Sequence, residues 1–501
     1  MSASGAKLYM FRNLWLMAIF FAIAALHVGA WSVHPPDVDS INFTAALDHF
    51  DLSNDAPHPP GYPLYVGLGR VAQHIVGANH AYQLVNLAML LGASILLIFI
   101  GSQFGSRHVG VIAGIVFAAH PLIWAATVVP ECYVSDAFGG TALVACGLKV
   151  GRRPVRGLML FIAIEFMIGM MRPTSCVLLL PAGLTAIWLS ARAGEHWGRW
   201  IAIAIIGAAT AAIAAYLSTA MLAGGFDVYS AQADRVMGAA FKSSSVLAGA
   251  PVQVHVAMVL RLVAWFALWC APLLLALAAC FMLGRIDGWL RIGLLIIAWI
   301  VPALGFYALI YYLKPAYQII FQPPLCLGLG WAMVRIGGDR MTRITVVMAA
   351  LLVAQLSFFW FGSKRLPQQL YHLTHRSFES RDAAWSRLEP IVARVPADQL
   401  VLYRDQPDVP VQALRLMRSD GFFAAQDVDG HITFNDNGKW LHATQENLSR
   451  YKSTLIVTSK DGGGADTMLA GPPLSLAKKD SSAAPSDIGA ARVVRSSPRV
   501  R

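Results

Sequence analysis

The sequence predicts an all-α polytopic membrane protein that carries a small mixed α/β domain after its last membrane span. Of its 501 residues, 56% are hydrophobic and only 13% are charged, and the mean hydropathy is +0.56. The core of a soluble globular protein cannot accommodate so many apolar residues. The net charge of +11 comes from lysines and arginines spread over short loops between apolar runs. This pattern is typical of membrane topology, so we expect no nucleic-acid partner.

Eleven apolar windows are long enough to cross a hydrocarbon core of about 30 Å, which needs about 20 helical residues. They lie near 13–33, 80–103, 109–127, 134–149, 157–171, 174–191, 199–222, 256–283, 289–311, 316–335 and 342–361. The first window is long and lacks a small-residue cleavage site, so we expect a retained anchor. The six cysteines show neither CxxC nor Cys/His ligand spacing, which predicts no disulfide framework and no zinc site.

Whether the segment 63–77 spans the membrane decides which loops are predicted to lie on the outer side. It is apolar but short, and it carries Arg70, Gln73 and His74. If it is an interfacial helix rather than a span, most loop lysines and arginines fall on one side. The positive-inside rule then places the amino terminus in the cytoplasm and the carboxyl terminus outside. A bacterial inner membrane is expected from the composition together with the family resemblance given below. The outer face then holds the first loop at 34–79, the loop at 223–255 and the short loops with Glu131, Arg172 and Lys314.

The composition changes after the last span. Residues 363–459 have the pattern of a soluble domain, with strand-like segments at 399–403 and 453–459 and a helical one between them. From 460 onward Gly, Ser, Ala, Pro and charged residues dominate, which predicts a disordered tail. The predicted organisation is a membrane module at 1–362, an outer α/β domain at 363–459 and a disordered tail at 460–501.

The first outer loop holds the first candidate for catalysis. Asp39 lies shortly after two prolines that end the first span and keep the chain extended. Partial desolvation at the membrane surface raises the pKa of a carboxyl group, which suits a general base acting on an acceptor hydroxyl. The alternative is that Asp39 only caps the next short helix, and Asp37 is close enough to be confused with it.

The same loop ends in the turn PHPPGYP, which contains His58 and Tyr62. Proline fixes φ and glycine permits the chain to reverse, so the turn is rigid and fits a loop packed over an active site. A proline-rich helix start with an incidental histidine is the alternative. Asp48, Asp51 and Asp55 are interpreted as the solvated face and caps of a short helix.

Further candidates stand in the shorter outer loops. Glu131 follows a proline between two spans and is either an acidic site residue or a helix N-cap. Arg172 and Lys314 each adjoin a proline, and cations there can neutralise the phosphate of a lipid-linked donor. Snorkelling to the headgroups is the alternative. Tyr317 and Gln318 beside Lys314 belong either to the site or to an aromatic belt.

Taken together, these residues give a sequence that resembles the GT-C-type integral membrane glycosyltransferases, particularly their protein O-mannosyltransferase-like group. The resemblance spans most of residues 12–361 and does not cover the carboxyl-terminal domain. The similar segments are HPPGYPLY at 58–65, PLIWAATVVPECYVSDAF at 121–138, GMMRPTS at 169–175 and YYLKPAYQIIFQPPLCLGLGWA at 311–332.

The resemblance implies that Asp39 is the catalytic base and Glu131 a second acidic site residue. It implies a polyprenyl-phosphate sugar donor, transfer of a hexosyl or pentosyl group with inversion, and an acceptor hydroxyl on a protein, lipid or glycan. The predicted substrate-binding residues are His58, Tyr62, Arg172, Lys314, Tyr317 and Gln318. We expect no dedicated metal site, although a divalent ion between the two acids stays open because no dense carboxylate motif decides it.

The sequence leaves two other functional classes of membrane protein open. A transporter or lipid flippase needs ionisable residues or broken helices near the middle of the bilayer, and Glu165 in the fifth predicted span favours it. A membrane scaffold that presents the outer domain would leave the acidic first loop without a role. In the enzyme, Asp39 and Glu131 are expected to line one outward-facing cavity.

Overall fold

The structure is a computed structural model that describes residues 3–191, 197–338 and 341–393, with the short segments 400–404, 413–417, 423–426, 432–436, 439–442, 454–458 and 467–471. The chain divides into two compact units. Unit 1 contains Met1–Trp31 and Ala46–Arg376, and unit 2 contains Ser32–Ala45 and Ser377–Arg501. The start of the first predicted outer loop therefore groups with the carboxyl-terminal part and not with the predicted membrane module.

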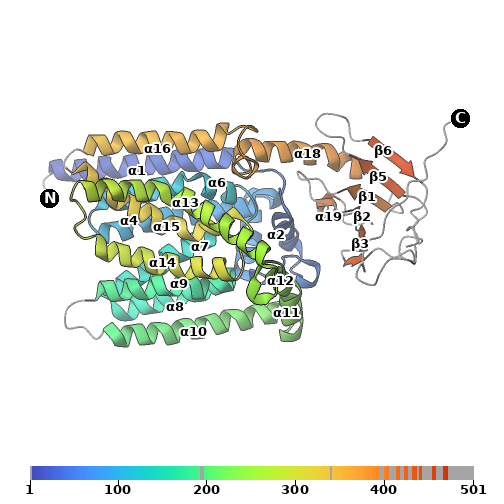
Figure 1. Cartoon of the computed structure of the whole chain (residues 1–501), viewed down its shortest axis with the longest axis horizontal. Coiled ribbons are helices and arrows are strands. Elements are labelled where there is room, and N and C mark those ends of the chain that lie inside the picture. The colour runs from blue at the N-terminus through green and yellow to red at the C-terminus, as the bar shows by residue number, and fades with distance from the viewer. Residues whose placement is uncertain are drawn as a thin grey trace. The chain divides into compact units, whose positions relative to one another are not determined.

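Unit 1 is a bundle of helices that run mostly along one direction (Figure 1). Its α-helices are α1 (Ala3–Gly29), α3 (Pro63–Val76), α4 (Ala81–Gln103), α5 (Arg107–Ala118), α6 (Pro121–Thr127), α7 (Val134–Val150), α8 (Pro154–Met171), α9 (Pro173–Ser190), α10 (Trp197–Leu222), α11 (Phe226–Ala233), α12 (Ala239–Ser244), α13 (Val252–Met282), α14 (Trp289–Leu309), α15 (Gln322–Gly337), α16 (Met341–Phe361) and α17 (Gln368–Tyr371). Short 3-10 turns lie at η1 (Leu52–Asn54), η2 (Ala78–His80), η4 (Val246–Ala248) and η5 (Pro315–Phe321), and η3 (Asp234–Gly238) is a π-helix. Helix α2 (Val38–Asp48) begins in unit 2 and ends in unit 1.

Eight helices of the described chain are long and apolar enough to cross a membrane. The pair α5 and α6, bent by 53° at their junction, makes a ninth if it counts as one span. Each of the eleven predicted windows coincides with a helix or with this bent pair. However, α7 has only 17 residues, and the described apolar stretch of α1 is Leu14–Gly29. The multi-pass class is confirmed, and the count of eleven spans stays a prediction.

Helix α3 covers the ambiguous segment 63–77. Its 14 residues are too few for the roughly 20 that a span needs, and it packs against α4 and α8. The Arg70 guanidinium donates hydrogen bonds to the carbonyl oxygens of Ala46 and Leu47, at 2.9 and 3.0 Å. A cation in that position stabilises the end of α2, whose last carbonyl groups lack helical partners. The interfacial interpretation of this segment is consistent with these contacts.

Helices α7 and α15 are the interior of the bundle. The apolar window of α15 is 83% buried, against 17% for α16 and 22% for α10, which lie at opposite edges (Figure 1). Helix α15 packs against α5 and α13, and α7 packs against α4, α8 and α9. Glu131 lies just before α7, and Lys314 lies just before η5 and α15. Both predicted site residues therefore stand at the entrance to a rigid central helix.

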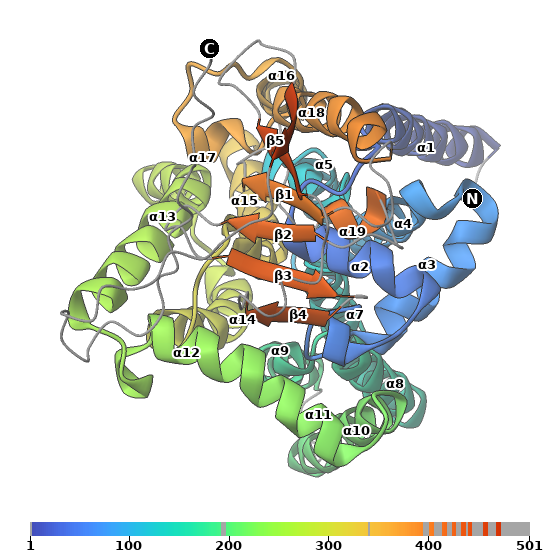
Figure 2. The same cartoon turned by 90° about the vertical axis from the view of Figure 1, so that its right-hand side faces the viewer.

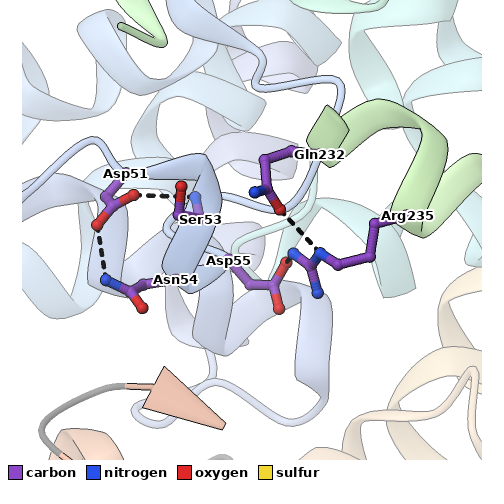
Figure 3. Close-up of polar contacts among 6 residues, drawn as sticks. All are labelled: Asp51, Ser53, Asn54, Asp55, Gln232 and Arg235. Atoms are coloured by element: carbon purple, nitrogen blue, oxygen red, sulfur yellow. Dashed lines mark hydrogen bonds and ion pairs between the residues drawn. The ribbon is translucent and has the colours of Figure 1, made fainter. Parts of the chain in front are cut away.

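The first loop meets the loop at 223–255 at one end of the bundle, opposite the start of α1 (Figure 1). Arg235 forms an ion pair with Asp55 at 2.7 Å and donates to Gln232 Oε1 at 2.8 Å (Figure 3). Asp51 caps η1 by accepting a hydrogen bond from the Ser53 amide at 2.9 Å. Asp51 and Asp55 are thus the N-cap and C-cap residues of η1, and Asp55 also joins two loops that are far apart in the sequence.

Unit 2 contains a six-stranded sheet in the order β4-β3-β2-β1-β5-β6 (Figure 2). The strands are β1 (Leu400–Arg404), β2 (Phe423–Gln426), β3 (Ile432–Asp436), β4 (Lys439–His442), β5 (Thr454–Thr458) and β6 (Thr467–Gly471), with the short helix α19 (Leu414–Met417). Strand β1 pairs in parallel with β2 and β5, and the remaining pairs are antiparallel. Strands β1 and β5 coincide with the predicted strands. Strand β6 lies inside the predicted disordered tail, whose other residues are outside the described chain.

Residues 32–45 are tied to α18 (His375–Ala393) within unit 2. The carboxylate of Asp382 on α18 accepts three hydrogen bonds from the start of this segment. The donors are the Ser32 hydroxyl at 3.0 Å and the backbone amides of Val33 at 3.1 Å and His34 at 2.9 Å. The His34 ring also stacks on Trp385, with 5.1 Å between centroids. The segment that carries Asp39 is therefore anchored by the helix that leads into the sheet.

Candidate active site

Arg172 stands at a helix break. Helix α8 ends at Met171 and α9 begins at Pro173, so Arg172 is the single residue between them. The residue before a proline avoids helical backbone angles, and Arg172 is extended, with φ −149° and ψ 97°. The two helices stay separate, and the guanidinium lies at the end of the bundle rather than along a continuous helix.

Arg172 forms an ion pair with Asp136, in the first turn of α7. Ser175 Oγ donates a hydrogen bond to the other oxygen of the same carboxylate, at 2.6 Å. The side chains of Asp136 and Arg172 are only 1% and 11% exposed. Because each charge is nearly removed from solvent, each depends on the other for compensation. The pair ties the central helix α7 to the junction of α8 and α9.

A second ion pair joins Lys314 and Glu131. Lys314 Nζ donates to Glu131 Oε1 at 3.0 Å. Like Arg172, Lys314 precedes a proline at which a helical segment begins, here η5. The side chain of Glu131 is 7% exposed and that of Lys314 is 32% exposed. Lys314 is therefore the more accessible of the two cations.

The loop that bears Glu131 is held from α4. Asn86 Nδ2 donates to the carbonyl oxygens of Val129 and Glu131, both at 3.0 Å. The Tyr65 hydroxyl on α3 donates to Asn86 Oδ1 at 3.1 Å. The N-cap residue of α7 is Tyr133, and it makes no side-chain capping bond. Glu131 is thus an ion-pair partner and not the cap that was its alternative interpretation.

Tyrosines surround both cations. The Arg172 guanidinium carbon lies 5.0 Å from the ring centroid of Tyr133 and 5.7 Å from that of Tyr317. Lys314 Nζ lies 5.9 Å from the Tyr133 ring, and Tyr307 stacks on Tyr317 at 5.4 Å and 7°. Rings in these positions attract the cations and limit their rotation. We call Glu131, Tyr133, Asp136, Arg172, Ser175, Tyr307, Lys314 and Tyr317 the charged cluster.

The cluster keeps Arg172 charged despite its burial. Burial by itself lowers the pKa of Arg172, but Asp136, Tyr307 and Tyr62 raise it, and the net pKa lies well above its usual value. Tyr62 comes from the HPPGYP turn, so this turn lies within electrostatic reach of the cluster. Two of the predicted substrate-binding residues, Tyr62 and Arg172, therefore lie close enough to interact electrostatically within unit 1.

The HPPGYP turn is shaped by its own sequence. Gly61 has φ +102° and Tyr62 has φ +50°, a left-handed region that glycine adopts without strain and other residues rarely adopt. The Gly61 amide donates to the His58 carbonyl oxygen at 3.1 Å. The Tyr62 hydroxyl and His58 Nε2 are 3.2 Å apart, in hydrogen-bond contact. Pro63 then occupies the first position of α3, where its fixed φ suits a helix start.

Asp39 belongs to unit 2, in the first turn of α2. The cap of α2 is Asp37, whose Oδ1 accepts a hydrogen bond from the Ser40 amide at 2.8 Å. Asp37 therefore caps α2 through the Ser40 amide, and the choice between the two interpretations of Asp39 stays open. The expectation that Asp39 and Glu131 line one cavity stays a prediction, as does a metal ion shared between them. Among the described residues, no three His, Cys, Asp or Glu side chains are arranged to hold a metal ion.

Gln318 is not part of the charged cluster. It is fully buried, and its amide nitrogen donates to the Leu262 carbonyl oxygen of α13 at 3.3 Å. The same nitrogen lies 3.4 Å from the Tyr312 hydroxyl. Gln318 thus ties η5 to α13, while the ring of Tyr317 beside it faces the Arg172 guanidinium.

The sequence interpretation missed Asp136 and Ser175. Asp136 lies five residues after Glu131 and opens an apolar helix, and an ionisable residue in such a helix is a functional candidate by itself. The same signal identified Glu165, so it could have identified Asp136. Ser175, by contrast, carries no such signal in the sequence, because a serine after a proline is ordinary at a helix start.

We expect Lys314→Met to destabilise unit 1 by about 1–2 kcal/mol, because it leaves the buried Glu131 carboxylate without this charged donor. The double variant Glu131→Gln/Lys314→Met is expected to recover part of this loss. Thermal unfolding in detergent measures both, with the exposed Lys242→Met as the matched control. Equal melting temperatures for Lys314→Met and Lys242→Met would show that the ion pair contributes nothing.

The fold and the charged cluster define the class as an integral, multi-pass membrane protein with a polar site at one end of its helical bundle. No known family profile matches the sequence, and no curated protein matches it. Among solved structures, the chain is similar to ArnT from Cupriavidus metallidurans bound to undecaprenyl phosphate. The TM-score is 0.50 at 15% identity, and the alignment covers 78% of this chain and 71% of ArnT.

The chain is also similar to the archaeal oligosaccharyltransferase AglB from Archaeoglobus fulgidus, in complex with an inhibitory peptide and a dolichol-phosphate. Here the TM-score is 0.45 at 12% identity, with 77% of this chain and 59% of AglB covered. At 15% identity, the likeness to ArnT concerns the fold alone. The chain thus shares a membrane fold with ArnT, and membership of the GT-C family and of its O-mannosyltransferase-like subgroup stays a prediction.

Proposed function

We propose that this protein is a membrane glycosyltransferase. It moves a hexosyl or pentosyl group from a polyprenyl-phosphate donor to a hydroxyl of a protein, lipid or glycan acceptor, at the outer face of the membrane. The observation that carries the proposal is the charged cluster, in which two cations and two acids meet at one end of an apolar bundle. The GT-C-like fold supports it.

In this proposal the two cations receive the donor phosphate. Charge-assisted hydrogen bonds to phosphate stabilise the anion that departs when the sugar is transferred. Lys314 is the cation that the phosphate reaches first, because it is 32% exposed against 11% for Arg172. As Lys314 turns to the phosphate, Glu131 becomes able to accept a hydrogen bond from a sugar or acceptor hydroxyl. Arg172 stays with Asp136 and supplies fixed positive charge behind it.

Asp39 is the proposed general base. It takes the proton of the acceptor hydroxyl while the acceptor oxygen forms a bond to the anomeric carbon. The bond from this carbon to the phosphate oxygen breaks, and polyprenyl phosphate leaves with the electron pair. Attack opposite to the leaving group inverts the configuration. His58 and Tyr62 are proposed to bind the substrate from the HPPGYP turn, close to Arg172.

The test is donor turnover. The purified protein in nanodiscs is expected to release polyprenyl phosphate from a polyprenyl-phosphate sugar when an acceptor extract is added, measured by mass spectrometry of the lipid. Release should require the acceptor and increase with its concentration. If no hexosyl or pentosyl donor is consumed under any condition, the transferase proposal is wrong.

A transporter or lipid flippase is the second candidate, and one observation favours it. Glu165 lies in the candidate span α8 and is 1% exposed, and its Oε2 has no hydrogen-bond partner among the described residues. Buried acids inside spans often mark a transport path. A flipping assay in proteoliposomes with a fluorescent polyprenyl-phosphate sugar separates the two candidates. Transbilayer movement that is lost in Glu165→Gln, without donor consumption, would favour transport.

A further inference from the structure

A groove lies on the side of unit 1, away from the charged cluster. Its volume is about 730 Å³, and its apolar lining includes Leu96 and Phe99 of α4, Ala142 and Cys146 of α7, and Ile164 of α8. Helices α4 and α8 both pack against α7, which forms the floor between them. All three helices coincide with predicted spans, so we expect the groove to face the hydrocarbon of the membrane.

Helix α3 borders the two helices that form the walls of the groove. Helix α3 packs against both α4 and α8, and Tyr65 of α3 stacks on Tyr82 in the first turn of α4, with 4.7 Å between centroids. We take the opposite end of the groove, beside the end of α4 and the start of α8, as its open end, because the charged residues of the lining gather there. A long apolar ligand that lies along α7 would then have its polar end at this position.

Three cations line that open end. Lys149 is in the last turn of α7, and Arg152 and Arg153 follow it just before α8 begins. Arg152 Nη2 donates to Gln103 Oε1 at the end of α4, at 2.8 Å, which holds the cations beside the groove. Among the described residues no Asp or Glu pairs with them. The site thus combines apolar walls of membrane depth with positive charge at the level of a headgroup.

We propose that this groove binds an anionic diacyl phospholipid, with an acyl chain along α7 and the phosphate between Lys149, Arg152 and Arg153. Basic pockets between membrane helices recognise acidic headgroups through charge, and the chain is held by apolar contact. A zwitterionic lipid places a second, positive group near the same cations and gains less from them. The assignment is independent of the proposed transferase activity, because the groove contains none of the residues of the charged cluster.

The experiment uses phosphatidylglycerol and phosphatidylcholine probes with a photoreactive group in one acyl chain, added to the purified full-length protein in detergent. We expect phosphatidylglycerol to label peptides of α4, α7 and α8 about tenfold more than phosphatidylcholine, as expected from one or two lysine or arginine contacts. Arg152→Gln/Arg153→Gln is expected to remove this preference, and Arg152→Lys/Arg153→Lys to keep it. The charge-preserving variant separates loss of charge from misfolding.

The matched control is Arg199→Gln/Arg343→Gln, which removes two exposed arginines from the starts of α10 and α16. These helices begin at the same end of the bundle but do not line the groove, so the control should keep the preference. Equal labelling by the two phospholipids would overturn the proposal, and so would an equal loss in the control. Displacement of phosphatidylglycerol by a lower concentration of undecaprenyl phosphate would assign the groove to a carrier lipid instead.

Discussion

Asp39→Asn is expected to lower sugar-transfer turnover by about 10²- to 10⁴-fold, the usual contribution of a positioned general base. Asparagine keeps the size of the side chain but cannot take the proton of the acceptor hydroxyl. The measurement is the initial rate of polyprenyl phosphate release at saturating donor, in nanodiscs.

Asp37→Asn is the matched control for Asp39→Asn. Asp37 caps α2 through the Ser40 amide, and asparagine caps a helix about as well as aspartate. Turnover and melting temperature should therefore stay close to those of the wild-type protein. Equal turnover of Asp39→Asn and wild type would remove Asp39 from the mechanism. A large loss of turnover in Asp37→Asn instead would show that the base is Asp37 and not Asp39.

Arg172→Gln is expected to destabilise the protein by about 3–5 kcal/mol, since it leaves the Asp136 carboxylate buried without its cation. We also expect turnover to fall, because fixed positive charge is lost behind the proposed phosphate position. Thermal unfolding in detergent and polyprenyl phosphate release measure the two effects separately. The double variant Asp136→Asn/Arg172→Gln should recover much of the stability, because it leaves no unpaired charge in the interior. It should not recover the turnover, because the positive charge of Arg172 is still missing.

The control for Arg172→Gln is Arg235→Gln, which breaks the exposed ion pair with Asp55 (Figure 3). The side chains of this pair are 48% and 25% exposed, so its loss should cost at most about 1 kcal/mol. If both variants shift the melting temperature equally, the burial of the Arg172 pair has no energetic consequence. If the double variant is no more stable than Arg172→Gln, the two side chains are not coupled.

The helices were largely predictable because each span needs a long apolar run, and such runs are visible in a single sequence. Helix α3 was also predictable, since its 14 residues are too short to span and mix apolar and polar positions. Their packing was not predictable. An apolar run by itself does not assign α15 to the interior and α16 to the edge, because lipid and protein are equally acceptable neighbours for apolar side chains.

The candidate site was also predictable only in part, because the sequence shows its cations but not which helices are neighbours. Arg172 and Lys314 could be found because each precedes a proline in an apolar region. Their partners could not be assigned, since pairing with Asp136 and Glu131 depends on which helices are neighbours. Gln318 shows the reverse case. It adjoins Tyr317 in the sequence, yet along η5 successive side chains point in different directions, and Gln318 contacts α13 instead.

The three hydrogen bonds to Asp382 change how the carboxyl-terminal part of the chain should be regarded. They place the segment with the proposed base in the same compact unit as α18 and the sheet. A chain cut after α16 would keep every candidate span and the whole charged cluster, yet it would lose the anchor that orders residues 32–45. The carboxyl-terminal part of the chain is therefore better described as the support of the segment with the proposed base than as an appendage to the membrane helices.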